Sequence, residues 1–205
     1  MKKLCLFGGT LVAAGLSGAA SAQAEFGISY VEAARAQTYT YAFGGDEEQG
    51  FGLSGPFSFS AAYRDGSASA FASATEVRVE ATDGDEIAGA LASIEEMRFS
   101  VTEATVALLT WDASTPHAGG YMELRDLSTG IFLVGVNLGP TQSAGGSLNI
   151  PLNPGVMYRI NFSIQAGQVL TGDSASSGFI SLVVPAPSSA ALLGLGGLLA
   201  ARRRR

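Results

Sequence analysis

Few side chains in this sequence could carry out acid–base or nucleophilic chemistry. His117 is the only histidine, and Asp112 and Ser114 precede it by a few residues. A histidine that acts as a general base needs a nucleophile and an orienting acid in defined geometry, which closeness in sequence does not provide. The sequence contains no GxSxG, HExxH or phosphate-loop motif. We therefore expect His117 to be an exposed loop residue, and we predict that the protein is not an enzyme.

Carboxylates are the most abundant chemical groups. One acidic cluster covers residues 46–48 and another covers residues 83–86. Calcium prefers oxygen ligands but takes about six to eight of them, and neither cluster has EF-hand spacing. We expect both clusters to be solvated loops and predict no metal site and no cofactor, with calcium binding as an alternative. Glu76 and Glu80 flank alternating valines, as on a solvated strand face, so a glycosidase pair is the weakest alternative.

Two aromatic residues could contact a sugar. Trp111, the single tryptophan, ends an apolar run, and Tyr121 begins an alternating segment. An exposed aromatic ring can stack on a sugar ring, whereas a ring that shares its face with apolar neighbours packs in the core. Leu109 and Ala107 share the face of Trp111, which favours a core position. A glycan site at Trp111 and Tyr121 remains an alternative.

The elements that would position these residues follow a β pattern. Residues 157–164 alternate strictly between apolar and polar side chains, and residues 76–80 and 121–125 do the same. Apolar runs at 106–111, 131–136 and 179–184 predict central strands that are covered on both faces. Nine or ten strands at a spacing of about 8–15 residues predict an all-β fold, an antiparallel β-sandwich of jelly-roll-like form. Residues 87–97 have apolar side chains near helical spacing, which indicates a short helix or turn.

Turn residues separate these runs. Residues 127–130 predict a hairpin turn between strands at 121–126 and 131–136. Asn153, Pro154 and Gly155 suit a type II turn. Residues 145–160 together resemble the final hairpin of many secreted jelly-roll domains, among them carbohydrate-binding modules.

The N-terminus has the three parts of a secretory signal peptide. Lys2 and Lys3 precede an apolar core over residues 4–16, and small residues follow it. Signal peptidase could cut after Ala22, with Ala20 two residues before it, or after Ala24. Cys5, the only cysteine, leaves with this peptide and stands at the wrong end of the apolar core for a lipoprotein.

The C-terminus is also built for a membrane. Val184, Pro185, Ala186 and Pro187 precede an apolar run at 190–201, and the chain ends on Arg202, Arg203, Arg204 and Arg205. The run would be about 18 Å long as a helix, which is marginal for a hydrocarbon core of about 30 Å. Terminal arginines resist crossing and stay on the cytoplasmic side.

This order of parts resembles the PEP-CTERM sorting signal of bacterial surface proteins. Val184, Pro185 and Pro187 match the Val-Pro-Glu-Pro head, Ala186 stands in place of its glutamate, and Arg202 to Arg205 match the cytoplasmic stop. The resemblance covers residues 184–205 and implies that an exosortase, a membrane protease-transferase, removes the tail during export. An ordinary C-terminal anchor that is never cut is the alternative.

These segments divide the chain into a signal peptide at 1–22, a β-sandwich domain at 23–184 and a sorting tail at 185–205. Without the two ends the chain has six arginines against 18 acidic residues, a net charge near −12, which makes nucleic acid an improbable partner. We expect an exported cell-surface or extracellular-matrix protein without catalytic activity, held transiently in the inner membrane and meeting signal peptidase and an exosortase on its way. The alternative is a glycan-binding domain, assisted by calcium, that meets extracellular polysaccharide.

Overall fold

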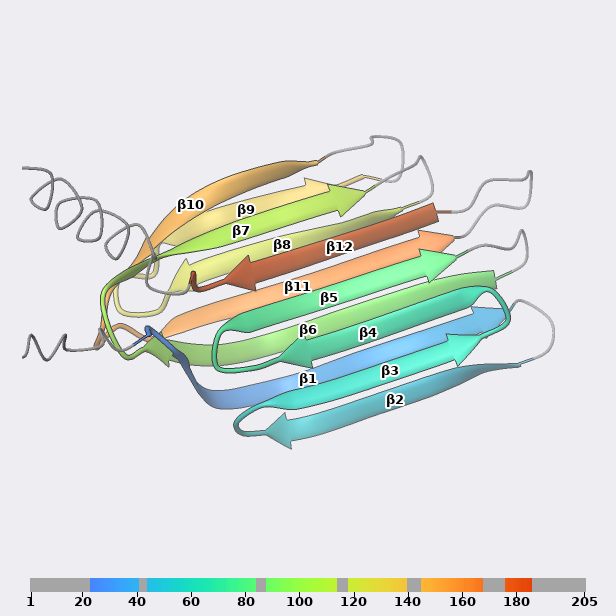
Figure 1. Cartoon of the computed structure of the whole chain (residues 1–205), viewed down its shortest axis with the longest axis horizontal. Helices are drawn as coiled ribbons and strands as arrows, with labels where there is room; N and C mark the ends of the chain where they lie inside the picture. Colours follow the sequence, from blue (N-terminus) through green and yellow to red (C-terminus); the bar gives the residue numbers. More distant parts are fainter. Residues whose placement is uncertain are drawn as a thin grey trace, which may run out of the picture.

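The fold is an all-β sandwich of two six-stranded antiparallel sheets, as the sequence predicts (Figure 1). A computed structural model of the chain describes residues 23–40, 44–83, 88–113, 118–139, 145–167 and 176–185. No helix in these ranges is long and apolar enough to cross a membrane. The predicted signal peptide at residues 1–22 and the apolar run at 190–201 lie outside the described residues.

Each sheet contains strands from both halves of the domain. Sheet A has the order β2-β1-β6-β11-β8-β9, and sheet B, in front in Figure 1, has the order β10-β7-β12-β5-β4-β3. The strand bounds in sheet A are β1 Phe26–Thr40, β2 Gly44–Leu53, β6 Ala88–Val101, β8 Gly119–Asp126, β9 Phe132–Leu138 and β11 Tyr158–Gly167. Those in sheet B are β3 Phe57–Tyr63, β4 Gly66–Ala72, β5 Glu76–Asp83, β7 Thr105–Ala113, β10 Gly146–Leu152 and β12 Ser176–Val183.

The last eight strands are nested as in a jelly roll. β8 pairs with β9, β7 with β10, β6 with β11 and β5 with β12, each pair antiparallel and each enclosing the one before it. Folding this long hairpin over itself sends alternate pairs to opposite sheets, which is the arrangement of a double-sheet jelly roll. Strands β1 to β4 extend both sheets on one side. The predicted jelly-roll-like form is therefore confirmed.

The core lies between the two sheets and follows the alternation of the strands. In β11, Tyr158, Ile160, Phe162 and Ile164 are buried, and the residues between them are half-buried on the outer face. Small side chains fill the side of the sandwich near β4, where Ala68, Ala70 and Ala72 are buried in succession. Because Cys5 is the only cysteine in the sequence, this burial must stabilise the domain without an internal disulfide.

The segment for which the sequence indicates a short helix or turn is a strand with a β-bulge. Ile160 of β11 lies opposite Met97 and Phe162 lies opposite Ile94, so Asn161 faces both Glu95 and Glu96. The extra residue returns Met97 to the core side, which is why two fully buried side chains are three residues apart. The bulge accounts for the three-residue spacing of Ile94 and Met97, and the prediction of a helix or turn in this segment is wrong, because residues 88–101 form strand β6.

Three further expectations are corrected by the sheet order. The apolar runs at 106–111 and 131–136 are not covered on both faces, because each sheet of a two-layer sandwich has one outer face and Val106 and Phe132 are 51% and 56% exposed on it. β9 is an edge strand rather than a central one. Residues 145–160 form no hairpin, since β10 lies in sheet B and β11 in sheet A.

Both predicted turns are in place. Asp126 accepts hydrogen bonds from the backbone N–H and the hydroxyl of Ser128 at 2.7 and 2.6 Å, which closes the β8–β9 hairpin. These bonds lower the pKa of Asp126 below its ordinary value, the Ser128 hydroxyl having the largest effect. Gly155 has φ +78°, the conformation that the third residue of a type II turn requires, although this turn connects two different sheets.

The bulge yields a stability prediction. Glu96 has φ +49°, an unfavourable conformation for a residue with a side chain, and its N–H donates to the Asn161 side-chain oxygen at 2.7 Å. Asn161→Ala leaves this N–H without its acceptor and should lower the free energy of unfolding by about 1–2 kcal/mol in urea denaturation. Asn137→Ala, on the exposed edge strand β9, should change it by less than about 0.5 kcal/mol. Equal effects of the two substitutions would contradict this account of the bulge.

Candidate functional site

The chain enters and leaves the sandwich at one turn. The Phe26 N–H donates to the carbonyl of Ala74 at 2.6 Å, and the Val184 N–H donates to the carbonyl of Thr75 at 2.9 Å. The Ser73 hydroxyl accepts from the N–H groups of Thr75 and Glu76 and thereby shapes the turn. We call residues 73–75 the exit turn and the end of the sandwich that carries it the exit end, which is on the left in Figure 1.

The predicted sorting head begins where the core stops. Val184 is 1% exposed and belongs to the core, whereas Pro185 is exposed. Ala186, Pro187 and Arg202 to Arg205 lie outside the described residues. A processing enzyme would therefore meet accessible chain at Pro185, directly after the buried Val184 that binds the exit turn.

The two candidate signal-peptide cuts differ in what they leave behind. Ala24 is 8% exposed and packs against the core, and the Glu25 N–H donates to the Thr102 hydroxyl at 3.0 Å. A cut after Ala22 keeps both features, whereas a cut after Ala24 removes a buried side chain. Ala20 and Ala22 themselves lie outside the described residues.

The acidic residues 46–48 form part of strand β2 and not a loop, which corrects the sequence prediction. Asp46 accepts from the Ala62 N–H at 3.1 Å and Glu48 accepts from the Ser60 N–H at 2.7 Å. Both donors belong to β3, the edge strand of sheet B, whose unpaired N–H groups would otherwise be open to another chain. Glu47 points to the other face and pairs with Arg35 at 2.8 Å. These carboxylates close one side of the sandwich.

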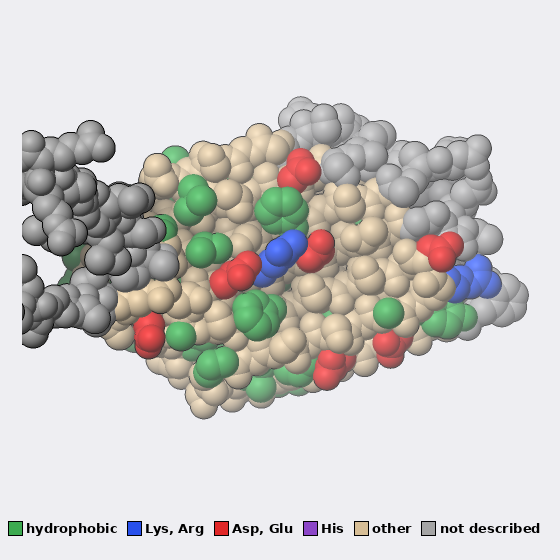
Figure 2. All heavy atoms as spheres, in the orientation of Figure 1, with side chains coloured by type: hydrophobic (Ala, Val, Ile, Leu, Met, Phe, Trp, Pro, Cys, Tyr) green, Lys and Arg blue, Asp and Glu red, His purple; other side chains and the backbone are tan. Residues whose placement is uncertain are grey.

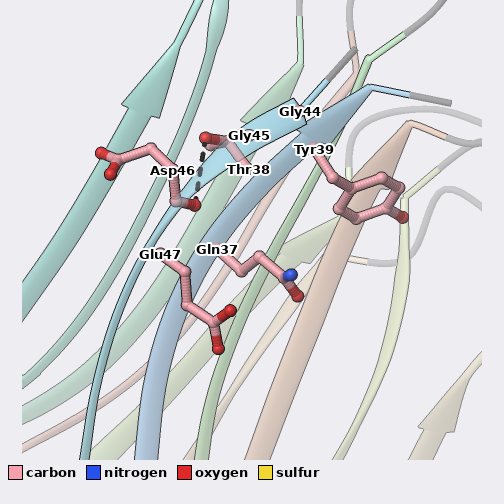
Figure 3. Close-up of a pocket in the computed structure, with 7 residues that line it drawn as sticks. All are labelled: Gln37, Thr38, Tyr39, Gly44, Gly45, Asp46 and Glu47. Carbon is pink, nitrogen blue, oxygen red and sulfur yellow. Dashed lines mark hydrogen bonds between the residues drawn. The ribbon is translucent and has the colours of Figure 1, made fainter. Parts of the chain in front are cut away.

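A hollow of about 340 Å³ lies on β1 and β2 beside this acidic strand (Figure 3). Gln37 and Glu47 are direct cross-strand partners in it, and the Thr38 hydroxyl donates to the Asp46 carbonyl at 3.5 Å. Tyr39 points to the opposite side from Asp46, and its hydroxyl accepts from the Gln165 side chain at 2.9 Å. The Thr38 and Tyr39 hydroxyls already form hydrogen bonds within the protein. We therefore do not assign a ligand to this hollow.

A second hollow of about 420 Å³ lies on the outer face of sheet B. Its polar lining consists of Ser60, Ser67, Ser69, Asp46 and Glu80, from strands β2 to β5. Hydroxyl and carboxylate groups of this kind exchange hydrogen bonds with a polyol. Of these two hollows, it is the one whose lining groups suit a sugar, although no aromatic ring lines it.

The centre of the same outer face carries an ion pair between Arg78 and Glu80 rather than a catalytic pair of glutamates. Arg78 lies between Glu76 and Glu80 on β5, pairs with Glu80 at 2.9 Å and lies 5.3 Å from the ring centre of Phe179. Glu76 accepts from the Ser181 hydroxyl at 3.2 Å. The two glutamates are four residues apart along one strand, about 13 Å, which exceeds glycosidase spacing. Figure 2 shows charged side chains gathered in a short row on this face.

The two aromatic residues of the predicted glycan site do not lie together. Trp111 is on β7 of sheet B and packs against the core, and its ring lies so close to Gly146 that an added Cβ would be 2.4 Å from it. Tyr121 is on β8 of sheet A and is 41% exposed on the outer face. Burial, and then the charges of Glu95 and Glu123, raise the pKa of Tyr121 above its ordinary value.

Arg159 connects the bulge to the strand of Tyr121. Its guanidinium pairs with Glu96 at 2.7 Å and also with Glu123. The hydrogen bond to Glu123 is the largest cause that raises the pKa of Arg159, so the arginine stays charged. Both terminal nitrogens of Arg159 and the carboxylates of Glu96 and Glu123 have partners, so the cluster connects strands β6, β8 and β11 of sheet A.

The other candidates from the sequence are only partly described. His117, Ser114 and residues 84–86 lie outside the described residues, while Asp112 is exposed on β7 and Asp83 is 4% exposed at the end of β5. No group of three or more potential metal ligands occurs among the residues that the structure describes. The exit turn was not foreseen, because its bonds join backbone groups that are far apart in sequence.

The edge contacts predict a difference between neighbouring glutamates. Glu48→Ala frees the Ser60 N–H on edge strand β3 and should lower the free energy of unfolding by about 1 kcal/mol and promote self-association. Glu47→Ala removes only an exposed ion pair and should cost less than about 0.5 kcal/mol. Urea denaturation and gel filtration would measure both effects. A Glu48→Ala protein as stable and monodisperse as the Glu47→Ala protein would show that the edge contact is unimportant.

Comparison with known protein families, curated proteins and solved structures finds no match to this chain. The function of the protein is therefore inferred from the geometry of the exit end and of the hollows, together with the terminal segments of the sequence.

Proposed function

We propose that the protein is an exported, noncatalytic surface protein whose jelly-roll domain is delivered by its C-terminal tail. The observation that carries the proposal is the position of the tail, which starts at exposed Pro185 immediately after buried Val184. Removal of the tail would leave every strand of the domain intact. In the tail, a Pro-x-Pro motif is followed by an apolar run and then by arginines. This order of parts supports an exosortase as the processing enzyme.

The charge of the domain is compatible with an extracellular location. The only lysines of the chain, Lys2 and Lys3, lie in the predicted signal peptide. In residues 23–184, acidic residues outnumber arginines threefold. Such a surface keeps a protein soluble and repels other acidic molecules. The described acidic side chains on β2 and β5 bind neighbouring groups of the domain itself, which supports a scaffolding or adhesive role over a catalytic one.

The tail can be tested by charge removal. Replacing Arg202, Arg203, Arg204 and Arg205 by alanine should release the C-terminus from the cytoplasmic face and mis-sort the protein, because charged side chains resist membrane crossing. Intact mass and cell fractionation in the native host would measure the effect. The wild-type product should start at Gln23, since Ala24 is packed in the core, and end near Pro185 to Pro187.

Two results would contradict this proposal. A variant with unchanged location and mass would show that the arginines do not sort the protein. A wild-type product that still carries Arg205 would instead indicate an ordinary anchor that is never cut.

The hydroxyl-lined hollow favours a second function, binding to extracellular polysaccharide. We propose it as the alternative because Ser67 and Ser69 of β4 place two hydroxyls on one face, between the carboxylates of Asp46 and Glu80. Each hydrogen bond that is lost should weaken binding by about 2- to 10-fold.

Affinity electrophoresis in polysaccharide extracted from the native host would test this alternative. The Ser67→Ala and Ser69→Ala variants should migrate faster than wild type. Ser58→Ala, on the same outer face but outside the hollow, should migrate as wild type does. Unretarded wild-type protein would dismiss the alternative.

A further inference from the structure

Exposed hydrophobic side chains gather at the exit end. Tyr30, Leu127, Ile131, Phe132 and Met157 lie there, and they are five of the ten large hydrophobic side chains that are exposed among the described residues. Ile131 and Phe132 are 59% and 56% exposed. We call these five residues the exit patch. Apolar side chains concentrated at one end of an otherwise acidic domain indicate an interaction surface.

Hydrogen bonds hold the parts of the patch together. The Leu127 N–H donates to the Met157 carbonyl at 2.9 Å, which joins the β8–β9 turn to the β10–β11 turn. The Ser29 hydroxyl lies 3.6 Å from the Met157 sulfur, which joins both turns to the start of β1. The patch is therefore continuous with the place where the chain enters the sandwich.

Arginine side chains cover the two aromatic rings of the patch. Arg125 lies 4.8 Å from the ring centre of Phe132, and Arg98 lies 5.4 Å from that of Tyr30. Arg125 also donates to the Gly130 carbonyl at 3.0 Å, so its position is fixed. Aromatic rings beside long cationic side chains are typical of the boundary between lipid headgroups and acyl chains.

The sequence after Pro185 determines what this end faces. Four residues, 186–189, separate Pro185 from the apolar run at 190–201. Even fully extended they span at most about 14 Å. While the tail is in a bilayer, the exit end consequently stays close to the lipid surface, whether the tail is cut later or kept.

We propose that the exit patch rests on the surface of the phospholipid bilayer and orients the anchored domain end-on. This inference depends on the membrane-anchored tail of the proposed function. Glu25 and Glu103 are also exposed at the exit end and balance the charges of Arg98 and Arg125, so the contact suits zwitterionic headgroups. The patch would present the anchored exit turn to a membrane enzyme at a fixed height.

Fluorescence quenching by lipid bromine can test the orientation. Full-length protein with its tail is reconstituted into phosphatidylcholine vesicles that contain lipids brominated on the upper acyl chain. The Phe132→Trp variant places an indole in the patch, while native Trp111, about 20 Å along β7 from its start at Thr105, serves as an internal reference. Tyr121→Trp is the matched control, because Tyr121 is 41% exposed on the outer face of sheet A and lies five residues, about 17 Å, along β8 from the β8–β9 turn.

The expected result is a loss of emission and a blue shift for the Phe132→Trp variant alone. Protein that sediments with the vesicles but shows no quenching at this position would overturn the inference and leave the anchor intact. Failure to sediment would overturn the inference together with the anchoring step of the proposed function. Equal quenching of Trp111 and of both variants would mean that the domain lies on its side, which also overturns it. Stronger quenching in phosphatidylglycerol vesicles would contradict the preference for zwitterionic lipid.

Discussion

The nested antiparallel pairing of β5 to β12 is the constraint on which the rest of the structure depends. Because β12 must return to lie beside β5, the last strand ends next to the turn at which β5 begins. The same turn binds the start of β1, so entry and exit share one end of the sandwich. Val184 at the end of the domain, Phe26 at its start and the exit patch are thereby brought to one end of the sandwich, although Phe26 and Val184 are separated by most of the chain.

In a two-layer sandwich each sheet also has an outer face and edge strands. In this protein, charged side chains lie on both outer faces and at the β2–β3 edge. At the β2–β3 edge, Asp46 and Glu48 bind backbone N–H groups, which keeps that edge from pairing with another chain. On the outer faces, Arg78 and Arg159 each lie between glutamates. Individual exposed pairs contribute little to stability, so their main effect is to keep flat strand surfaces soluble while apolar side chains concentrate at the exit end.

Much of the fold was predictable from the sequence, and the exceptions have a common cause. Alternation identified β5, β8 and β11, because an apolar side chain at every second position needs only its own strand to be recognised. β2 was missed because its side chains bind across to β3 rather than to a core. The bulge at Glu95 and Glu96 imitated helical spacing, since an inserted residue changes which side chains point inward. The separation of Trp111 and Tyr121 on different sheets depends on strand order, which no local pattern contains.

By itself the sequence determined that the domain is all-β and acidic, because alternation and charge are local properties of the chain. It also contains the two terminal segments on which the proposed function depends. Only the tertiary structure decided that Ala24 and Val184 are buried while Pro185 is accessible. It alone placed Leu127, Phe132 and Met157 at the end from which the tail leaves. The physical reason is that burial and proximity arise from pairing between distant strands, and that pairing is set by the balance of contacts across the whole sandwich.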